Sequence, residues 1–182
     1  LNGRSSGIIA KMNSLCDQDV IEALYRASAA GVKIRLIIRG ICCLKTGIPG
    51  VSENISVRSI VGNFLEHSRI FYFENDGMSE YYLASADWMP RNLDRRVEIM
   101  FPVEDEELRS RIMEVLEVEL ADNVKAHALT STGKYVKAPR RKGIREINSQ
   151  LEFGIQAKKT METRDSGKNE RVFIPETGDG NL

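Results

Sequence analysis

Residues 8–38 read IIAKMNSLCDQDVIEALYRASAAGVKIRLII, and this stretch decides the fold class. Its first half-dozen residues are mostly apolar and predict a buried strand over 8–15. Apolar residues then recur at helical spacing from Val20 to Ala27, with Asp17 or Asp19 placed to cap the helix and Gly31 placed to end it. Residues 32–38 are rich in β-branched side chains and predict a second strand. A strand, a helix and a strand within about thirty residues form a βαβ unit, whose strands should be parallel.

Further elements follow outward from this unit. The pattern predicts short strands over 57–61, 68–73, 81–86 and 96–103, and an Asn-Asp-Gly turn at residues 75–77. Residues 104–121 predict an amphipathic helix with acidic residues in its first turn. A Ser-Thr-Gly turn at 131–133 should join two more short strands. The chain is therefore expected to be an α/β domain.

Composition excludes several classes of protein. Lys plus Arg and Asp plus Glu each total 26, so net charge alone does not indicate a polyanion partner. No apolar run is long enough to span a bilayer. The three cysteines fit no metal-binding spacing, and an odd number without a secretion signal favours a reducing cytoplasm. Because the sequence starts at Leu1 without a Met, we expect it to be part of a longer protein.

The chain changes character after about Asn123. We expect one domain over residues 1–137 and a polar, basic tail over 138–182 that is mostly disordered. The tail starts with Arg140, Arg141, Lys142 and Arg145, continues through a weakly helical stretch, and ends in Gly, Asp and Asn. From about Lys142 onward, it is predicted to lack a stable packed fold.

His67 and Arg69 are the most informative pair of polar residues. Residues two apart in a strand share a face, so both side chains can point into one cleft. An imidazole exchanges protons near neutral pH, and a guanidinium beside it can bind phosphate with two hydrogen bonds. From spacing alone, an ordinary surface pair on an edge strand is the alternative.

Three other places carry polar residues that suit a site. Residues 85–98 read SADWMPRNLDRRVE, a turn rich in charge, for which a solvated loop is the alternative. Arg39 follows the strand 32–38, at the end where parallel sheets bind ligands, although it is equally well explained as a surface arginine. Lys11 lies inside the first strand, where a buried ammonium needs a counter-charge or a ligand.

Together these stretches resemble a known family. His67-x-Arg69-(x4)-Glu74 is similar to the His-x-Lys-(x4)-Asp motif of the phospholipase D superfamily, with Arg for Lys and Glu for Asp. Longer runs resemble the C-terminal domain of polyphosphate kinases, namely IRLIIRGICCL at 34–44, VRSIVGNFLEHSRI at 57–70 and SADWMPRNLDRRVE at 85–98. The similarity covers roughly residues 8–137. It implies a phospholipase D-like mixed sheet flanked by helices.

The resemblance also implies a function. Polyphosphate kinases reversibly transfer the terminal phosphate of ATP to inorganic polyphosphate through a phosphohistidine, with Mg²⁺. The phosphohistidine and the Mg²⁺ ligands belong to the upstream domains, so no metal ligand is expected in this chain, and the fragment alone should be inactive. The matching positions imply that Arg39 and His67 bind ATP or ADP and that His67 is catalytic. The full-length protein is expected to be a homo-oligomer, in the cytoplasm that the cysteine count favours. Five further residues are candidate phosphate contacts: Lys11, Arg69, Arg91, Arg95 and Arg96.

Two alternatives remain open. A phospholipase D-like phosphodiesterase or nuclease would pair two His67 side chains across a dimer, although the replaced Lys and Asp count against it. A polyanion-binding module would instead use the basic residues of 140–145.

Overall fold

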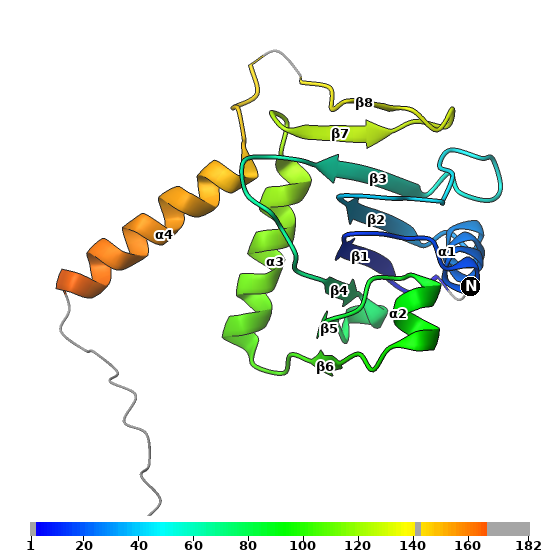
Figure 1. Ribbon diagram of the computed structural model, residues 1–182, viewed down its shortest axis with the longest axis horizontal. Coiled ribbons are helices and arrows are strands. Elements are labelled where there is room, and N and C mark those ends of the chain that lie inside the picture. The colour runs from blue at the N-terminus through cyan, green and yellow to red at the C-terminus, as the bar shows by residue number, and fades with distance from the viewer. Residues whose placement is uncertain (1–2, 141–142, 167–182) are drawn as a thin grey trace, which may run out of the picture.

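The structure, a computed structural model, describes residues 3–140 and 143–166. Its strands form one sheet in the order β6-β5-β4-β1-β2-β3-β7-β8 (Figure 1). Strand β1 pairs in parallel with β2, and β2 with β3, whereas the other neighbours are antiparallel. The sheet is therefore mixed, as predicted. The strand bounds are β1 Gly7–Met12, β2 Lys33–Ile38, β3 Ile55–Ile60, β4 Ile70–Phe73, β5 Glu80–Ala84, β6 Met100–Pro102, β7 Ala126–Leu129 and β8 Tyr135–Lys137.

The predicted βαβ unit is confirmed. Helix α1 (Gln18–Ala29) joins β1 to β2. Asp17 is its N-cap, because the Asp17 carboxylate accepts a hydrogen bond from the Val20 amide at 3.0 Å. Gly31 follows the helix with a φ of 92°, a left-handed conformation that glycine adopts without steric cost.

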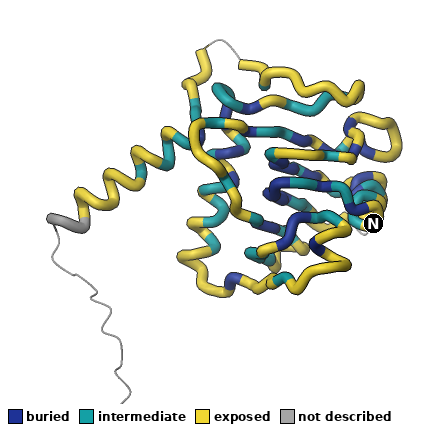
Figure 2. Tube along the Cα trace, in the orientation of Figure 1, coloured by how far each residue is buried: buried dark blue, intermediate teal, exposed yellow. Residues whose placement is uncertain are grey.

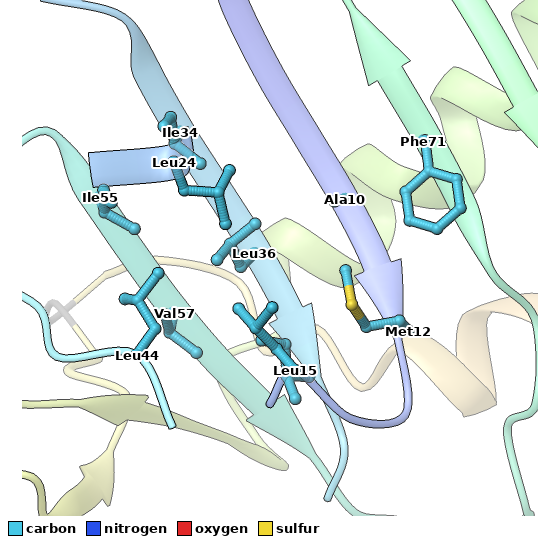
Figure 3. Close-up of a cluster of buried hydrophobic side chains, with 11 residues drawn as sticks. Ala10, Met12, Leu15, Leu24, Ile34, Leu36, Leu44, Ile55, Val57 and Phe71 are labelled. Carbon is cyan, nitrogen blue, oxygen red and sulfur yellow. The ribbon is translucent and has the colours of Figure 1, made fainter. Parts of the chain in front are cut away.

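Helices cover both faces of the sheet and give three layers (Figures 1 and 2). Because side chains alternate along a strand, Ala10 and Met12 of β1 face α1, and Ile9 faces α3 (Glu106–Ala121). The larger cluster, drawn in Figure 3, packs Leu24 of α1 against the central strands. The other cluster surrounds Leu116 of α3, which is fully buried. The predicted helix 104–121 is thus confirmed, with Asp105 as its N-cap.

Three local expectations were wrong, the first being the strand predicted over 96–103, which is confined to Met100–Pro102. The segment around Pro90 was expected to be a turn, but residues Pro90–Arg95 form a short helix, α2, with Pro90 in its first turn, where the missing amide hydrogen costs nothing. The strand predicted over 68–73 starts only at Ile70. His67 and Arg69 therefore lie in the irregular segment 61–69, not on a strand.

The tail is packed at one place, contrary to the expectation for residues after about Lys142. Residues Ser149–Ser166 form helix α4, and Ser149 is fully buried. Its amide and hydroxyl both donate to one Asp122 carboxylate oxygen, at 2.8 and 2.9 Å. Asp122 caps the end of α3, so a distant residue supplies the partner that composition could not reveal. The expected disorder at 141–142 and 167–182 lies outside the described residues. Within the part that is described, no helix is both long and apolar enough to cross a membrane.

The topology gathers the candidate residues at one edge of the sheet. Parallel strands β1 and β2 end there, followed by Asn13 and Arg39. Strand β4 runs antiparallel to β1 and begins there, preceded by His67 and Arg69. Strand β5 runs antiparallel to β4 and ends there, followed by Asp87. Four chain segments that are distant in sequence thus meet at the same edge.

Candidate functional site

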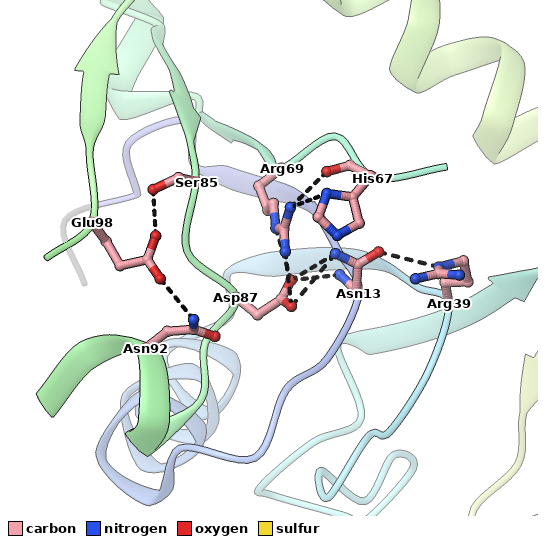
Figure 4. A network of polar contacts seen from close by, with 8 residues as sticks. All are labelled: Asn13, Arg39, His67, Arg69, Ser85, Asp87, Asn92 and Glu98. Carbon is pink, nitrogen blue, oxygen red and sulfur yellow. Dashed lines mark hydrogen bonds and ion pairs between the residues drawn. The ribbon is translucent and has the colours of Figure 1, made fainter. Parts of the chain in front are cut away.

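The centre of the site is the Asp87 carboxylate (Figure 4). Arg69 binds it with two hydrogen bonds, Nε to Oδ1 at 3.1 Å and Nη2 to Oδ2 at 3.2 Å. The backbone amide of Asn13 donates to Oδ1 at 2.7 Å, and its side-chain amide also donates to the carboxylate. The side chains of Arg69 and Asp87 are each only 10% exposed. This two-point ion pair, shielded from water, holds the Arg69 guanidinium in one orientation.

Arg69 in turn holds His67. Its Nη1 donates to Nδ1 of His67 at 2.7 Å and to the His67 carbonyl oxygen at 2.8 Å. A guanidinium has donors only, so Nδ1 must accept, and the neutral imidazole carries its proton on Nε2. The expectation that His67 and Arg69 point together is confirmed, although an irregular segment brings them together instead of a strand.

Arg39 lies at the other end of the network. Its Nε donates to Oδ1 of Asn13 at 3.1 Å, so Asn13 bridges Arg39 and Asp87 (Figure 4). Neither Nη atom of Arg39 has a hydrogen bond to any described residue, and the side chain is half-buried. The guanidinium is thus oriented through one nitrogen and keeps its forked end available to an anion.

A second carboxylate, Glu98, is fixed beside the network. Ser85 donates to one oxygen, and Nδ2 of Asn92 donates to the other at 2.7 Å. These hydrogen bonds, with a weaker contribution from the charge of Arg96, hold the pKa of Glu98 below its ordinary value. Asn92 comes from the unpredicted helix α2, and sequence reasoning gave it no role. Had the helix that begins at Pro90 been predicted, one of its side chains would have been expected to face the site.

Lys11 receives the counter-charge that its burial demands. Its ammonium lies 2.6 Å from a carboxylate oxygen of Glu66 and 2.9 Å from one of Glu119. Burial and a hydrogen bond with Glu66 raise the pKa of Glu119 to about 8. Burial would raise the pKa of Glu66 as well, but hydrogen bonds with Glu119 and Lys11 outweigh it and lower that pKa to about 2.

These pKa values indicate that one proton resides on Glu119 at neutral pH. Oε2 of Glu119 is buried and has no hydrogen-bonding partner among the described residues. Lys11 and Glu66 also line a small cavity together with Asn13 and Arg39. Lys11 therefore lies next to Asn13 and Arg39 of the network.

The remaining candidates lie apart from the network. Arg91, Arg95 and Arg96 are exposed on or just after α2, and no hydrogen bond within the described residues ties them to it. Trp88 stacks on Phe71 with ring centroids 4.8 Å apart, so it fills the edge of the core. In the tail, Arg140 pairs with Glu146 and Arg145 with Glu152, which weakens the case for a polyanion-binding surface there.

The described residues offer no metal centre. Within 3–140 and 143–166, no three His, Cys, Asp or Glu side chains gather closely enough to hold a metal ion.

Comparison with known proteins identifies the family. The sequence model described as polyphosphate kinase C-terminal domain 2 matches residues 1–150. The chain belongs to the polyphosphate kinase family. This confirms the resemblance drawn from the runs at 34–44, 57–70 and 85–98.

Curated polyphosphate kinases are close relatives over most of this chain. The Pseudomonas putida enzyme is 58% identical over 138 residues, which are 76% of this chain and 19% of that protein. Polyphosphate kinase 1 of Chlorobaculum tepidum is 52% identical over 173 residues, 94% of this chain and 24% of that protein. The chain thus spans about a fifth to a quarter of the length of these polyphosphate kinases.

Solved structures agree on the fold. The crystal structure of polyphosphate kinase from Porphyromonas gingivalis superimposes with a TM-score of 0.83 at 43% identity, covering 88% of this chain and 24% of that one. A phospholipase D family member from Salmonella typhimurium superimposes with a TM-score of 0.50 at 15% identity, covering 75% and 86% of the two chains. The phospholipase D-like fold expected for this part of a polyphosphate kinase is therefore confirmed.

Proposed function

We propose that this chain supplies part of the active site of a polyphosphate kinase, which reversibly transfers the terminal phosphate of ATP to inorganic polyphosphate. The observation that carries the proposal is the chain of contacts from Arg39 through Asn13, Asp87 and Arg69 to His67, at the edge where the strands β1, β2 and β5 end. Transfer of a phosphoryl group depends mainly on positioning and charge stabilisation. A rigid row of cationic and neutral donors suits that task.

Arg39 is proposed to bind the phosphates of the nucleotide. Its Nε is held by Asn13, so the forked end is already oriented when an anion arrives. A guanidinium can contact two phosphate oxygens at once, and fixing it in advance reduces the entropy lost on binding.

His67 is proposed to act on the phosphoryl group in transfer. With Nδ1 occupied by Arg69, the Nε2 hydrogen is the free donor of the imidazole. It can donate to a phosphoryl oxygen, or give its proton to the leaving oxygen while the adjacent Arg69 charge stabilises nearby phosphate. Asp87 sets the Arg69 orientation and so fixes His67 indirectly.

We further propose that His67 does not carry the phosphate covalently. In the imidazole geometry described here, one ring nitrogen is already used by Arg69, and the other is needed as donor. The phosphohistidine, the Mg²⁺ ligands and the rest of the ATP site would then come from the other part of the full-length protein, as the family resemblance implies.

A labelling experiment tests this assignment. Full-length protein is incubated with radiolabelled ATP, Mg²⁺ and short polyphosphate, and acid-labile phosphate is mapped to peptides. The proposal expects labelled polyphosphate and a labelled histidine outside residues 1–182. The isolated 182-residue chain should make no polyphosphate. Label retained on His67, or elongation by the isolated chain, would overturn the assignment.

A further inference from the structure

The side chain of Gln150, at the start of α4, is hydrogen-bonded to the segment that carries His67. Its Oε1 accepts from the Phe64 amide at 3.0 Å, and its Nε2 donates to the Phe64 carbonyl at 2.9 Å. The same Nε2 also donates to Oε1 of Glu66 at 2.8 Å. The carboxamide therefore pairs with the segment as a neighbouring strand would, and uses both of its donor hydrogens to do so.

The Gln150 carboxamide lies very close to Gly62. A Cβ placed on Gly62 would overlap the Oε1 and Cδ atoms of Gln150. The φ of Gly62 is not in the left-handed region, so its backbone would tolerate another residue. A larger residue at position 62 would therefore displace the Gln150 carboxamide without straining the backbone.

Little else fixes this segment. Residues 61–69 form no strand ladder, and the largest apolar side chains in it, Phe64 and Leu65, are 71% and 73% exposed. Apolar burial therefore cannot hold the segment. Its fixed points are Glu66, which binds Lys11 and Gln150, and Arg69, which binds Asp87. His67 lies between these two.

The start of α4, which carries Gln150, is held by hydrogen bonds to the residues that follow α3. Ser149 is held by Asp122, and Ile147 exchanges two hydrogen bonds with Asn123, each at 3.0 Å. Gln150 thus extends from a fixed helix start toward a segment that has few other restraints.

We propose that Gln150 is a positioning residue for His67, and that the first turn of α4 belongs to the catalytic unit. This inference rests on the proposed role of His67. Misplacing a reacting group by about 1 Å can cost on the order of 100-fold in rate. Gln150 makes three hydrogen bonds to the segment, so losing all three would free it.

The test uses the full-length protein with four single variants, to which one double variant and His67→Ala are added below. Gln150→Ala removes the contact, Gln150→Glu keeps the shape but replaces the donors, and Gly62→Ala displaces the carboxamide from the other side. Gln156→Ala is the matched control, because the Gln156 side chain lies on the same helix but bonds only Glu114 and Arg111 of α3 among the described residues. Hydrogen exchange of the 61–69 peptide and steady-state kinetics are measured for each.

We expect faster exchange in the 61–69 peptide and a fall in kcat of about 10-fold or more for both Gln150→Ala and Gly62→Ala, with KM for ATP changed less than about 3-fold. The double variant Gly62→Ala/Gln150→Ala should be no worse than either single change, because both remove the same contact. Gln150→Glu should resemble Gln150→Ala, and Gln156→Ala should match the wild type.

The outcomes separate this inference from the proposed function. Wild-type exchange and kcat in Gln150→Ala, with His67→Ala strongly impaired, would overturn the positioning role alone. Unimpaired turnover in His67→Ala would overturn the proposed function on which the inference rests. Unchanged protection in peptides of β1 and β2 shows that each variant is folded.

Discussion

Arg69 donates to Nδ1 of His67 over 2.7 Å, and this contact fixes the hydrogen of the neutral imidazole on Nε2. The second histidine of the chain has the opposite arrangement. Nδ1 of His127 lies 3.1 Å from the Lys125 carbonyl oxygen, which can only accept, so Nδ1 must carry the hydrogen there. The two histidines therefore provide two opposite tautomers that can be compared within one protein.

The two imidazoles should show different tautomers in nitrogen NMR spectra. In alkaline solution, where imidazole side chains are neutral, we expect the Nε2–H form for His67 and the Nδ1–H form for His127. A His67→Gln variant assigns the signals. Observing the Nδ1–H form for His67 would show that Arg69 does not make this contact in solution.

Removing the Asp87 carboxylate should destabilise the protein markedly. Asp87→Ala leaves Arg69 buried without its counter-charge, which should lower the free energy of unfolding by about 3 kcal/mol. Denaturant titration measures the change. Glu114→Ala is the control, because its ion pair with Arg111 is about half exposed and should be worth under about 0.5 kcal/mol. Equal effects of the two changes would contradict the account of the buried pair.

The pKa of Glu119 predicts how stability responds to pH. Because the folded-state pKa of about 8 lies above the ordinary 4.5, the folded state binds the proton more tightly than the unfolded state. This contribution is complete below pH 4.5 and is lost as pH rises through 8. Glu119→Gln mimics the protonated carboxyl and removes this titration. The free energy of unfolding of the wild type should therefore fall, relative to Glu119→Gln, as pH rises from 5 to 9. A constant difference across that range would show that Glu119 titrates normally.

Arg39 should matter for the nucleotide and little for folding. Arg39→Ala removes one partly exposed side chain, so the free energy of unfolding should change by less than about 1 kcal/mol. In the full-length protein, loss of a two-point phosphate contact should raise KM for ATP or lower kcat/KM by about 10-fold or more. The exposed Arg26 of α1 provides a matched arginine-to-alanine control. Wild-type kinetics for ATP in Arg39→Ala would show that Arg39 does not bind the nucleotide.

Local patterns in the sequence predicted much of this architecture. The βαβ unit, the cap at Asp17 and helix α3 follow from spacing within one segment. The pairing of His67 with Arg69 was predicted from strand alternation, although the irregular segment 61–69 is what brings them together. Burial of Lys11 predicted that a counter-charge exists.

The identity of distant partners was not accessible. Glu66 and Glu119 meet Lys11, and Asp87 meets Asn13, only because the strand order brings separate segments to one edge. Helix α2 was missed because proline is favoured both in turns and at the first position of a helix. The docked start of α4 was missed because its stabilisation comes from Asp122 and not from apolar periodicity.

The rate of polyphosphate synthesis from ATP by full-length protein carrying His67→Ala decides whether the network around Asp87 serves phosphoryl transfer. We predict a rate at least about 100-fold below that of the wild type, because the donor positioned by Arg69 is lost. The free energy of unfolding should stay within about 1 kcal/mol of the wild-type value, because the imidazole is exposed. A folded variant that synthesises polyphosphate at the wild-type rate would contradict the assignment of this site.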